Sequence, residues 1–247
     1  MPLDYQAIEL QPQQAAGHAQ RVRDGQWAGC SVTMPLKDAF VPFMDEVSDR
    51  VARLGALNTI VKRPDGTLFG ENTDVHGLVQ SLRDFGVQHM DQVLILGAGN
   101  TALAAVEAAA ELGAQEVEFV VRDASRASEA LDLAGRLGLA ATATAIGQVR
   151  PGLPGGRPVI STLPARAADA WVPALGDGSS VLLDVAYDPW PSQLAASWGG
   201  EVISGLHMLV HQAVEQVRLF TGLDFDTQRT ENVTNAMYQA LGLHRRG

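Results

Sequence analysis

The sequence predicts an α/β protein in two lobes: a doubly wound domain with a parallel sheet, and a smaller α/β domain. Between residues 75 and 204, short apolar runs alternate with helical segments, which is the pattern of right-handed β–α–β crossovers. Before residue 75 the elements are shorter and include a hairpin signal, and after residue 204 comes a long amphipathic helix. We expect residues 1–74, completed by the helices of residues 205–247, to form the smaller domain, and residues 75–204 to form the doubly wound one.

The composition describes a folded protein and excludes several function classes. Hydrophobic residues make up 46% and charged residues 19% of the 247 residues, as in an ordinary globular chain. The formal net charge of −10 argues against a non-specific nucleic-acid binder, whose binding surface would be basic. Cys30 is the single cysteine, which excludes an internal disulfide and a cysteine-rich zinc site. Its apolar neighbours indicate a buried structural thiol, with a reactive thiol as the alternative.

The expected location follows from two patterns that the sequence lacks. No apolar run reaches the roughly 18 residues that a membrane span requires. The first ten residues have neither the basic start nor the apolar run of a signal peptide. We therefore expect a cytoplasmic protein, either monomer or homodimer, whose partner is a small-molecule substrate, with no nucleic acid and no membrane.

Short elements fill the N-terminal third. Residues 3–10 have the texture of a strand, and residues 18–25 that of a helix that ends at Gly25. Residues 57–72 indicate a hairpin, because Pro64-Asp65-Gly66 is a strong turn signal between two β-rich runs. A strand over residues 29–35 and a short helix over residues 36–44 complete this part.

Strands and helices then alternate strictly. An amphipathic helix over residues 75–86 ends at Gly86, and the apolar run of residues 92–99 indicates a buried strand that ends in glycines. An Ala-rich helix runs from residue 101 to Gly113. The later elements are strands at residues 116–123, 158–164 and 180–189, and helices at residues 125–138 and 206–222.

The loop GAGNTA, residues 97–102, carries the most informative local motif. Gly97, Gly99 and Ala102 fit the G-x-G-x-x-A pattern directly after a strand and at the start of a helix. Gly97 permits the tight turn, Gly99 lets the backbone approach a pyrophosphate, and Ala102 lets helix and strand pack closely. The amides at the helix start then receive the anion. We expect a Rossmann-type dinucleotide site; the alternative is a tight turn that binds nothing.

The end of the next strand, VVRDASR, bears on the choice of cofactor. NADP binders place an arginine here and NAD binders an acidic residue. Arg122 and Arg126 could clamp a 2′-phosphate, whereas Asp123 could accept a hydrogen bond from a free ribose hydroxyl. We favour NADP and keep NAD as possible; the two arginines could also belong to a solvated helix start.

Lys37 and Asp74 are candidates for catalysis. Lys37 closely follows Pro35 where a strand ends, and a lysine in a partly desolvated cleft can act as acid or base. Asp74 ends the segment GENTD just before a helix. Taken singly, Lys37 would more often be a surface lysine, and Asp74 a helix cap or an Asx-turn. Their positions on facing loops beside a nucleotide domain make the pair a candidate site.

A possible metal site on the C-terminal helix is the weaker hypothesis. His207, His211 and Glu215 fall on one helix face at the spacing of metal ligands. Apolar residues fill the rest of the helix, and no further cluster supplies ligands. We therefore expect a packed or solvated helix face and no metal.

Several motifs, taken together and in order, resemble the shikimate dehydrogenase family. They are SVTMPLK, ALNT, GENTD, GAGNTA, STLP, DVAYDPWPSQL and GLHMLVHQAVEQVRLFTG, and they cover nearly the whole chain. The resemblance implies NADP-dependent, reversible reduction of 3-dehydroshikimate to shikimate in aromatic amino-acid biosynthesis. Two alternatives stay open: a quinate/shikimate dehydrogenase that uses NAD, and a nucleotide-binding paralogue without catalysis.

Residue roles carry over from the resemblance. Lys37 would donate the proton to the new alkoxide when hydride reaches the keto carbon. Asp74, held by Asn72 and Thr73, would bond the same hydroxyl and pair with the lysine. The substrate-binding residues would be Thr33, Asn58, Tyr187 and Gln212. The cofactor-binding residues would be Gly97, Ala98, Gly99, Asn100, Thr101, Arg122, Arg126, Gly205 and Met208.

The sequence also departs from this family. The family usually begins with a strand, a Ser-x-Ser carboxylate-binding loop and a helix before anything like residues 3–10, and this sequence has none of them. With Met1 as the start, the comparison predicts a weakened N-terminal lobe and poor substrate affinity. Smaller departures are Ser31 where Asn is usual, Asn100 where a third glycine is usual, and Val121 where Asn often precedes the arginine.

Overall fold

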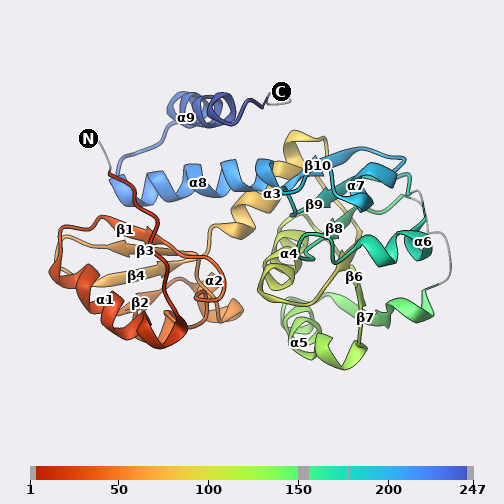
Figure 1. Ribbon diagram of the computed structural model, residues 1–247, viewed down its shortest axis with the longest axis horizontal. Helices are drawn as coiled ribbons and strands as arrows, with labels where there is room; N and C mark the ends of the chain where they lie inside the picture. Colours follow the sequence, from red (N-terminus) through yellow and green to blue (C-terminus); the bar gives the residue numbers. More distant parts are fainter. Residues whose placement is uncertain (1–3, 150–155, 177, 244–247) are drawn as a thin grey trace. The chain divides into compact units, whose positions relative to one another are not determined.

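The computed structural model describes residues 4–149, 156–176 and 178–243 (Figure 1). The chain divides into two compact units. Unit 1 comprises Met1–Thr73 and Ala213–Ala236, and unit 2 comprises Asp74–Gln212 and Met237–Gly247. No helix within the described ranges is both long and apolar enough to cross a membrane.

Unit 1 is built on a four-stranded sheet with the strand order β1-β3-β4-β2. Strands β3 (Thr59–Lys62) and β4 (Leu68–Glu71) form the predicted hairpin, and Gly66 at its turn has a φ of +88°. Strand β1 (Gly29–Ser31) pairs antiparallel with β3, and β2 (Glu46–Val47) pairs parallel with β4. Strand β1 therefore stands at one edge of this sheet.

Two α-helices belong to the N-terminal part of unit 1. Helix α1 (Ala15–Asp24) ends before Gly25, as predicted. Helix α2 (Asp49–Leu54) was not predicted, although its cap is standard: Ser48 Oγ accepts from the Val51 amide at 3.2 Å. The core that joins helix and sheet includes Val22 of α1 and Ile60 of β3, both fully buried.

Two predictions for the N-terminal third are wrong. Residues 4–10 are not a strand; residue 3 lies outside the described residues. Their apolar texture has the period of a strand, but no described residue forms a ladder with them, and a strand exists only with a partner. Residues 36–44 are not an α-helix but turns followed by the 3-10 turn η2 (Val41–Phe43). Pro42 within it has no amide hydrogen for a helical bond.

Unit 2 carries the predicted parallel sheet, with six strands in the order β10-β9-β8-β5-β6-β7 and every neighbouring pair parallel. The strand order reverses between β5 and β8, and ligands of such sheets bind beyond the carboxyl ends of the strands at this point. Two of the strands, β7 and β10, had no counterpart among the predicted elements. The strands are β5 (Gln92–Leu96), β6 (Glu116–Val121), β7 (Ala140–Ala145), β8 (Val159–Ser161), β9 (Leu182–Asp184) and β10 (Val202–Ser204).

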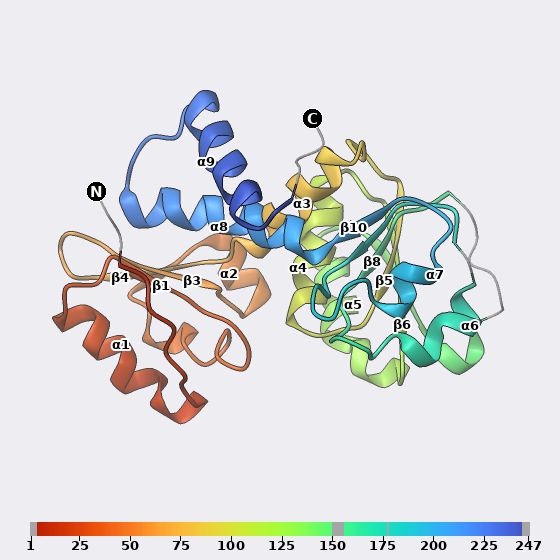
Figure 2. The same ribbon diagram turned by 45° about the horizontal axis from the view of Figure 1, so that its top comes forward.

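Helices lie on both sides of this sheet (Figure 1 and Figure 2). Helices α4 (Asn100–Glu111) and α5 (Ser128–Arg136) lie on one side, and α6 (Val172–Leu175) and α7 (Gln193–Ser197) on the other. Because both faces are covered, the inner strands are rich in apolar residues, and Val93 to Leu96 of β5 are fully buried. The doubly wound fold is therefore confirmed.

Three longer helices complete the chain: α3 (Asp74–Asp84), α8 (Gly205–Thr221) and α9 (Thr227–Ala240). The first two match the helices predicted over residues 75–86 and 206–222. Residues 205–212 of α8 belong to unit 2 and residues 213–221 to unit 1. Further 3-10 turns are η1 (Pro12–Gln14), η3 (Ala124–Ala127), η4 (Ile146–Gln148) and η5 (Asp169–Trp171).

Candidate active site

The glycine loop lies in unit 2, where the sheet reverses its order. Gly97 follows β5 directly, and its amide donates to Val120 O of β6 at 2.9 Å. Its φ of +106° favours glycine, and an added Cβ would lie 2.7 Å from Thr162 Oγ1. Gly99, the N-cap of α4, has no atom within 4 Å of the position of an added Cβ. The loop is thus fixed at Gly97 and open at Gly99, as an anion site at a helix start requires.

A cavity of about 290 Å³ adjoins this loop. Its lining includes five of the nine predicted cofactor residues. Asn100 and Thr101, which begin α4, and Gly205 and Met208 of α8 are not among the lining residues. The lining residues are Gly97, Ala98, Gly99, Val121, Arg122, Asp123, Arg126, Leu163 and Trp171.

Two apolar residues of this cavity were missed by the sequence analysis. Leu163 belongs to the quoted motif STLP directly after β8, so its place beyond a strand end could have been inferred. Trp171, only 5% exposed, comes from η5, and no local pattern marks it. Both give the cavity apolar surface next to its charged rim.

The rim of the cavity carries two arginines and one aspartate. Arg122 and Arg126 are exposed, and neither forms a salt bridge with another residue of the described ranges. Asp123 Oδ1 accepts from Ser125 Oγ at 2.8 Å and from the Ser125 amide at 3.0 Å. These two donors hold the pKa of Asp123 below its ordinary value. The carboxylate therefore caps η3, and the charge of Arg126 also lowers its pKa.

In unit 1, backbone bonds connect the loops that carry Thr33, Lys37 and Asn58. The Leu57 amide donates to Lys37 O at 2.9 Å, and the Val32 amide donates to Asn58 O at 2.7 Å. Lys37 is buried, with 9% of its surface exposed, whereas Thr33 is exposed. The loops that carry these three predicted site residues are thus joined by backbone hydrogen bonds within unit 1.

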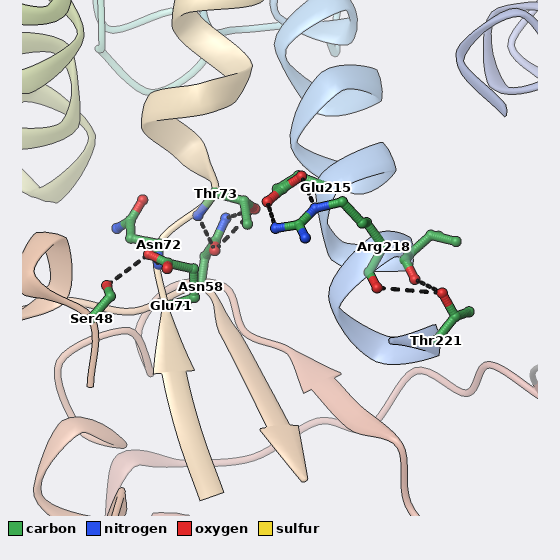
Figure 3. A network of polar contacts seen from close by, with 9 residues as sticks. Ser48, Asn58, Glu71, Asn72, Thr73, Glu215, Arg218 and Thr221 are labelled. Carbon is green, nitrogen blue, oxygen red and sulfur yellow. Dashed lines mark hydrogen bonds and ion pairs between the residues drawn. The ribbon is translucent and has the colours of Figure 1, made fainter. Parts of the chain in front are cut away.

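Asn58 holds the end of the GENTD segment (Figure 3). Its Oδ1 accepts from the Thr73 amide at 2.8 Å, and its Nδ2 donates to Thr73 Oγ1 at 3.0 Å. Both side chains are at most 2% exposed. Asp74, the next residue and the first of α3, is itself 5% exposed. Asn58 was predicted as a substrate ligand. Its two side-chain bonds to Thr73 also fix the backbone directly before Asp74.

Glu71 and Asn72 anchor the start of the same segment (Figure 3). Ser48 Oγ and the Asn72 amide both donate to Glu71 Oε1, at 2.7 and 2.8 Å. Asn72 Nδ2 donates to Ala56 O at 3.0 Å. The side chain of Asn72 thus binds the backbone of Ala56, and the side chain of Asn58 binds the backbone of Thr73, so two bonds join these segments. The role of Asn72 in holding Asp74 stays a prediction.

Gln216 of α8 is a site residue that the sequence analysis missed. Its Nε2 donates to Asn58 O at 3.0 Å and to Thr59 Oγ1 at 2.9 Å, and its Oε1 accepts from Ser31 Oγ at 2.7 Å. The side chain is 5% exposed. Gln216 therefore holds the backbone oxygen of Asn58 and the hydroxyl of Thr59, and all three residues belong to unit 1.

The loop after β9 carries Tyr187, which is 47% exposed. At its base, the buried Asp184 accepts from Ser192 Oγ at 2.6 Å and from the Ala186 amide at 3.3 Å. Burial raises the pKa of Asp184, and these donors oppose the rise. Gly205, the first residue of α8, packs closely against the backbone of this loop, because an added Cβ there would lie 2.0 Å from Val185 O.

Helices α3 and α8 meet within unit 2 at Gly77. An added Cβ on Gly77 would lie 2.7 Å from Met208 O and 3.1 Å from Gln212 Cβ. Gln212 Nε2 donates to Leu209 O at 3.1 Å. Met208 and Gln212, predicted at the nicotinamide and at the substrate, thus lie on the α8 face that receives α3.

The two histidines that suggested a metal have other partners. His207 Nδ1 lies 3.0 Å from Tyr238 Oη, and His211 Nε2 lies 2.9 Å from Asp84 Oδ2 and 3.3 Å from Tyr238 Oη. All of these residues belong to unit 2, whereas Glu215 belongs to unit 1 and pairs with Arg218. Among the described residues, no group of three or more His, Cys, Asp or Glu is arranged to hold a metal ion.

Two family models match the chain. The model of the shikimate dehydrogenase substrate binding domain matches residues 1–60. The model of the shikimate 5'-dehydrogenase C-terminal domain matches residues 205–233. The first match contains the loops of Thr33, Lys37 and Asn58, and the second contains Gln212 and Gln216.

Curated relatives point to the same family. A shikimate dehydrogenase (NADP(+)) of Synechococcus sp. is 32% identical over 78% of this chain and 71% of its own length. A quinate/shikimate dehydrogenase (NAD(+)) of Corynebacterium glutamicum is 31% identical over 81% of this chain and 75% of its own. The pentafunctional AROM polypeptide of Yarrowia lipolytica is 34% identical over 90% of this chain, but the chain spans only 15% of that polypeptide.

A solved structure has the same fold. The shikimate dehydrogenase of Mycobacterium tuberculosis superposes with a TM-score of 0.78 and 36% sequence identity. The similarity covers 93% of this chain and 86% of that chain. It therefore extends over both units.

Proposed function

Since the chain belongs to the shikimate dehydrogenase family, we propose that it catalyses the NADP-dependent, reversible reduction of 3-dehydroshikimate to shikimate. Membership makes the chain an oxidoreductase. The substrate and the cofactor preference are our proposals. We assign cofactor binding to unit 2 and most of the substrate binding to unit 1.

The cofactor assignment is supported by the cavity beside the glycine loop. Its residues suit a dinucleotide: Gly99, the N-cap of α4, leaves free space beside the start of the helix, and Leu163 and Trp171 add apolar surface. Arg122 and Arg126 would clamp a 2′-phosphate on the ribose, because guanidinium groups bind phosphate in bidentate geometry. NADPH supplies the hydride when bound.

The substrate would be held by hydroxyl and amide side chains. Thr33 and Asn58 in unit 1 are proposed as ligands of its hydroxyl and carboxylate groups, together with Tyr187 and Gln212 in unit 2. Gln216 is proposed as a support of this set, since it binds Asn58 O and not a side chain of the predicted site.

Lys37 is proposed as the group that moves the proton. As the keto oxygen gains negative charge, the Lys37 ammonium would donate a proton to it and leave a hydroxyl. Asp74 would accept a hydrogen bond from that hydroxyl and orient the lysine. The burial of both side chains supports this assignment, because low exposure strengthens the interaction between opposite charges.

The cofactor preference rests on one arrangement. The Asp123 carboxylate accepts a hydrogen bond from the Ser125 amide, while Arg122 and Arg126 line the cavity. The test is a comparison of initial rates with NADPH and NADH for the parent chain, Arg122→Ser and Arg126→Ser. We expect each variant to raise the KM for NADPH about tenfold, the size of one lost charged hydrogen bond, and to leave the KM for NADH unchanged. Arg136→Ser, an exposed change on α5 outside the cavity, is the control. Equal effects on both cofactors would contradict the assignment.

A second candidate is a quinate/shikimate dehydrogenase that uses NAD. The Corynebacterium glutamicum relative bears that name, and Asp123 lines the same cavity. Activity with NAD and quinate, without activity with NADPH and 3-dehydroshikimate, would favour it. Cofactor binding with no turnover of either substrate would instead favour a paralogue without catalysis.

A further inference from the structure

Unit 2 contains a buried polar cluster that the proposed mechanism does not use. Its members are His207 and His211 of α8, Tyr238 of α9 and Asp84, the last residue of α3. Tyr238 is 1% exposed, and His211 and His207 are 5% and 9% exposed. Buried polar groups cost free energy unless they are hydrogen-bonded, and apolar side chains would fill such a space without that cost. What polar side chains add to packing is direction, because hydrogen bonds depend on angle as well as distance.

The donors and acceptors of this cluster form one chain. A carboxylate oxygen only accepts hydrogen bonds, so we assign the hydrogen of His211 Nε2 to its bond with Asp84 Oδ2, at 2.9 Å. Tyr238 Oη, 3.3 Å from the same nitrogen, is then a second acceptor. The hydroxyl hydrogen of Tyr238 is donated to His207 Nδ1 at 3.0 Å. One hydroxyl therefore orients two imidazole rings that stand one turn apart on α8.

Helix α3 contacts α8 at two places, and the first is at Gly77. There an added Cβ would lie 2.7 Å from Met208 O and 3.1 Å from Gln212 Cβ, so the two helices are close. A single contact of this kind limits the distance between two helices and leaves the rotation of each about its own axis free.

The second contact is made by the oriented imidazole rings at the other end of α3. Asp84 binds His211, and the ring of Phe85 stands edge-on to the ring of His207, with centroids 4.9 Å apart. Residues 77 and 84 lie about 10 Å apart along a helix. Two contacts at this separation, one of them directional, set both the distance and the rotation of α8 against α3.

The rotation of α8 matters because His207 and His211 directly precede Met208 and Gln212 in the chain. Side-chain groups lie about 5–6 Å from the axis of a helix, so a rotation of about 10° displaces them by about 1 Å. A misplacement of about 1 Å in a catalytic site costs up to about 100-fold in rate.

We propose that Tyr238 is a positioning residue for the reaction. Its hydroxyl sets the rotation of the first turns of α8, and thereby places Gln212 relative to Asp74 at the start of α3. Tyr238 acts through His207 and His211, and not by contact with the reactants. The inference rests on the proposed function, in which Gln212 and Asp74 both meet the substrate.

The test compares Tyr238→Phe, which removes the hydroxyl and keeps the ring, with a matched control on the same helix. Thr234 is 2% exposed, and its Oγ1 donates to Thr230 O at 2.8 Å, a bond within α9. Thr234→Val therefore also loses a buried hydroxyl but leaves the bonds of Tyr238 in place. Initial rates with NADPH and varied 3-dehydroshikimate are measured for both variants and the parent, and urea unfolding shows that each is folded in the assay. We expect kcat/KM for 3-dehydroshikimate to fall at least about tenfold in Tyr238→Phe and less than about twofold in Thr234→Val.

A second readout needs no turnover. The methyl groups of the methionines are isotope-labelled for NMR, and the Met208 signal is assigned by its loss in Met208→Leu. We expect Tyr238→Phe to move this signal and Thr234→Val to leave it in place, while the signal of Met34 in unit 1 stays unchanged in both. A loss of stability alone would not produce this difference.

His207→Phe is the second variant, should Tyr238→Phe fail to fold. It removes the acceptor of the Tyr238 hydroxyl and keeps a ring against Phe85. We expect it to lower kcat/KM and to move the Met208 signal in the same way.

Two outcomes would overturn the proposal. One is parent-level kcat/KM in Tyr238→Phe, whatever its stability, because the hydroxyl would then serve the fold alone. The other is an unmoved Met208 signal in that variant. A parent chain without turnover would instead contradict the proposed function, and the Met208 signal would then still decide whether the hydroxyl sets the position of α8.

Discussion

The Gln216 side chain on α8 donates its amide to the backbone oxygen of Asn58, 158 residues away, at 3.0 Å. Asn58 in turn brackets Thr73 through both of its side-chain atoms. A residue of α8 therefore supports the backbone that leads into Asp74, and does so within unit 1. This relationship explains how a loop of polar residues keeps one conformation.

Replacing Gln216 by alanine should destabilise the protein and impair catalysis. The change removes the donor of Thr59 Oγ1, the acceptor of Ser31 Oγ and one of the two donors of Asn58 O, which keeps the Val32 amide; a buried polar group left unsatisfied costs about 1–3 kcal/mol. Urea unfolding measures this loss, and kcat/KM for 3-dehydroshikimate should fall while cofactor affinity is kept. Gln228→Ala, an exposed change on α9, should stay within about 0.5 kcal/mol of the parent. Equal stability of the two variants would mean that the Gln216 bonds contribute nothing.

Two glycine-to-alanine changes should have opposite signs. At Gly205 an added Cβ meets Val185 O at 2.0 Å, so Gly205→Ala must displace the backbone after β9 and should cost more than about 2 kcal/mol. At Gly135, in α5, nothing lies within 4 Å, so Gly135→Ala should stabilise by about 0.5–1 kcal/mol. Thermal unfolding of both variants tests this pair of predictions. An unchanged stability of Gly205→Ala would show that Gly205 and the backbone at Val185 are packed less closely than described.

Asp184 and Asp123 should give opposite pH dependences of stability. Burial raises the folded-state pKa of Asp184 above its ordinary 3.8, so the folded protein binds more protons than the unfolded chain between these values. The free energy of unfolding then falls as pH rises through that window. Asp184→Asn cannot ionise, and we expect it to gain stability relative to the parent as pH rises from about 4.

For Asp123 we expect the opposite dependence of the free energy of unfolding on pH. Its folded-state pKa is lowered by Ser125, so its stabilising contribution is present above the unfolded pKa and is lost as pH falls through the folded one. Asp123→Asn should therefore be less stable than the parent at neutral pH and approach it in acid. Urea unfolding from pH 3 to about pH 7 measures both variants. Parallel curves for Asp184→Asn and the parent would exclude a raised pKa.

The parts of the fold that were predictable depend on local patterns. The continuous apolar run of β5 and the glycines after it identified both the strand and the turn, because each of those residues has a local reason to be there. Strand β7 was missed, since its sequence AATATA lacks large β-branched and aromatic residues and gains its place from pairing with β6.

The parts that failed depend on distant partners. Residues 4–10 have the texture of a strand, but no sequence window states whether a neighbour is present to pair with it. Gln216 and Trp171 were missed for the same reason: one acts on a residue 158 positions away, and the other reaches a cavity defined by three different loops. Lys37 and Asp74 were candidates because of their positions on loops beside a nucleotide domain, and the resemblance of the surrounding motifs to a family then gave each of them a role.

The central claim is that Lys37 moves the proton in NADPH-dependent reduction of 3-dehydroshikimate. The most direct measurement is the decrease in NADPH absorbance with this substrate, for the parent chain and for Lys37→Ala in parallel, together with NADPH binding by both. We predict turnover by the parent and a loss of about 100- to 10,000-fold in kcat for the variant, with NADPH affinity unchanged. Parent-level turnover in Lys37→Ala, or NADPH binding by the parent without any turnover, would contradict the account.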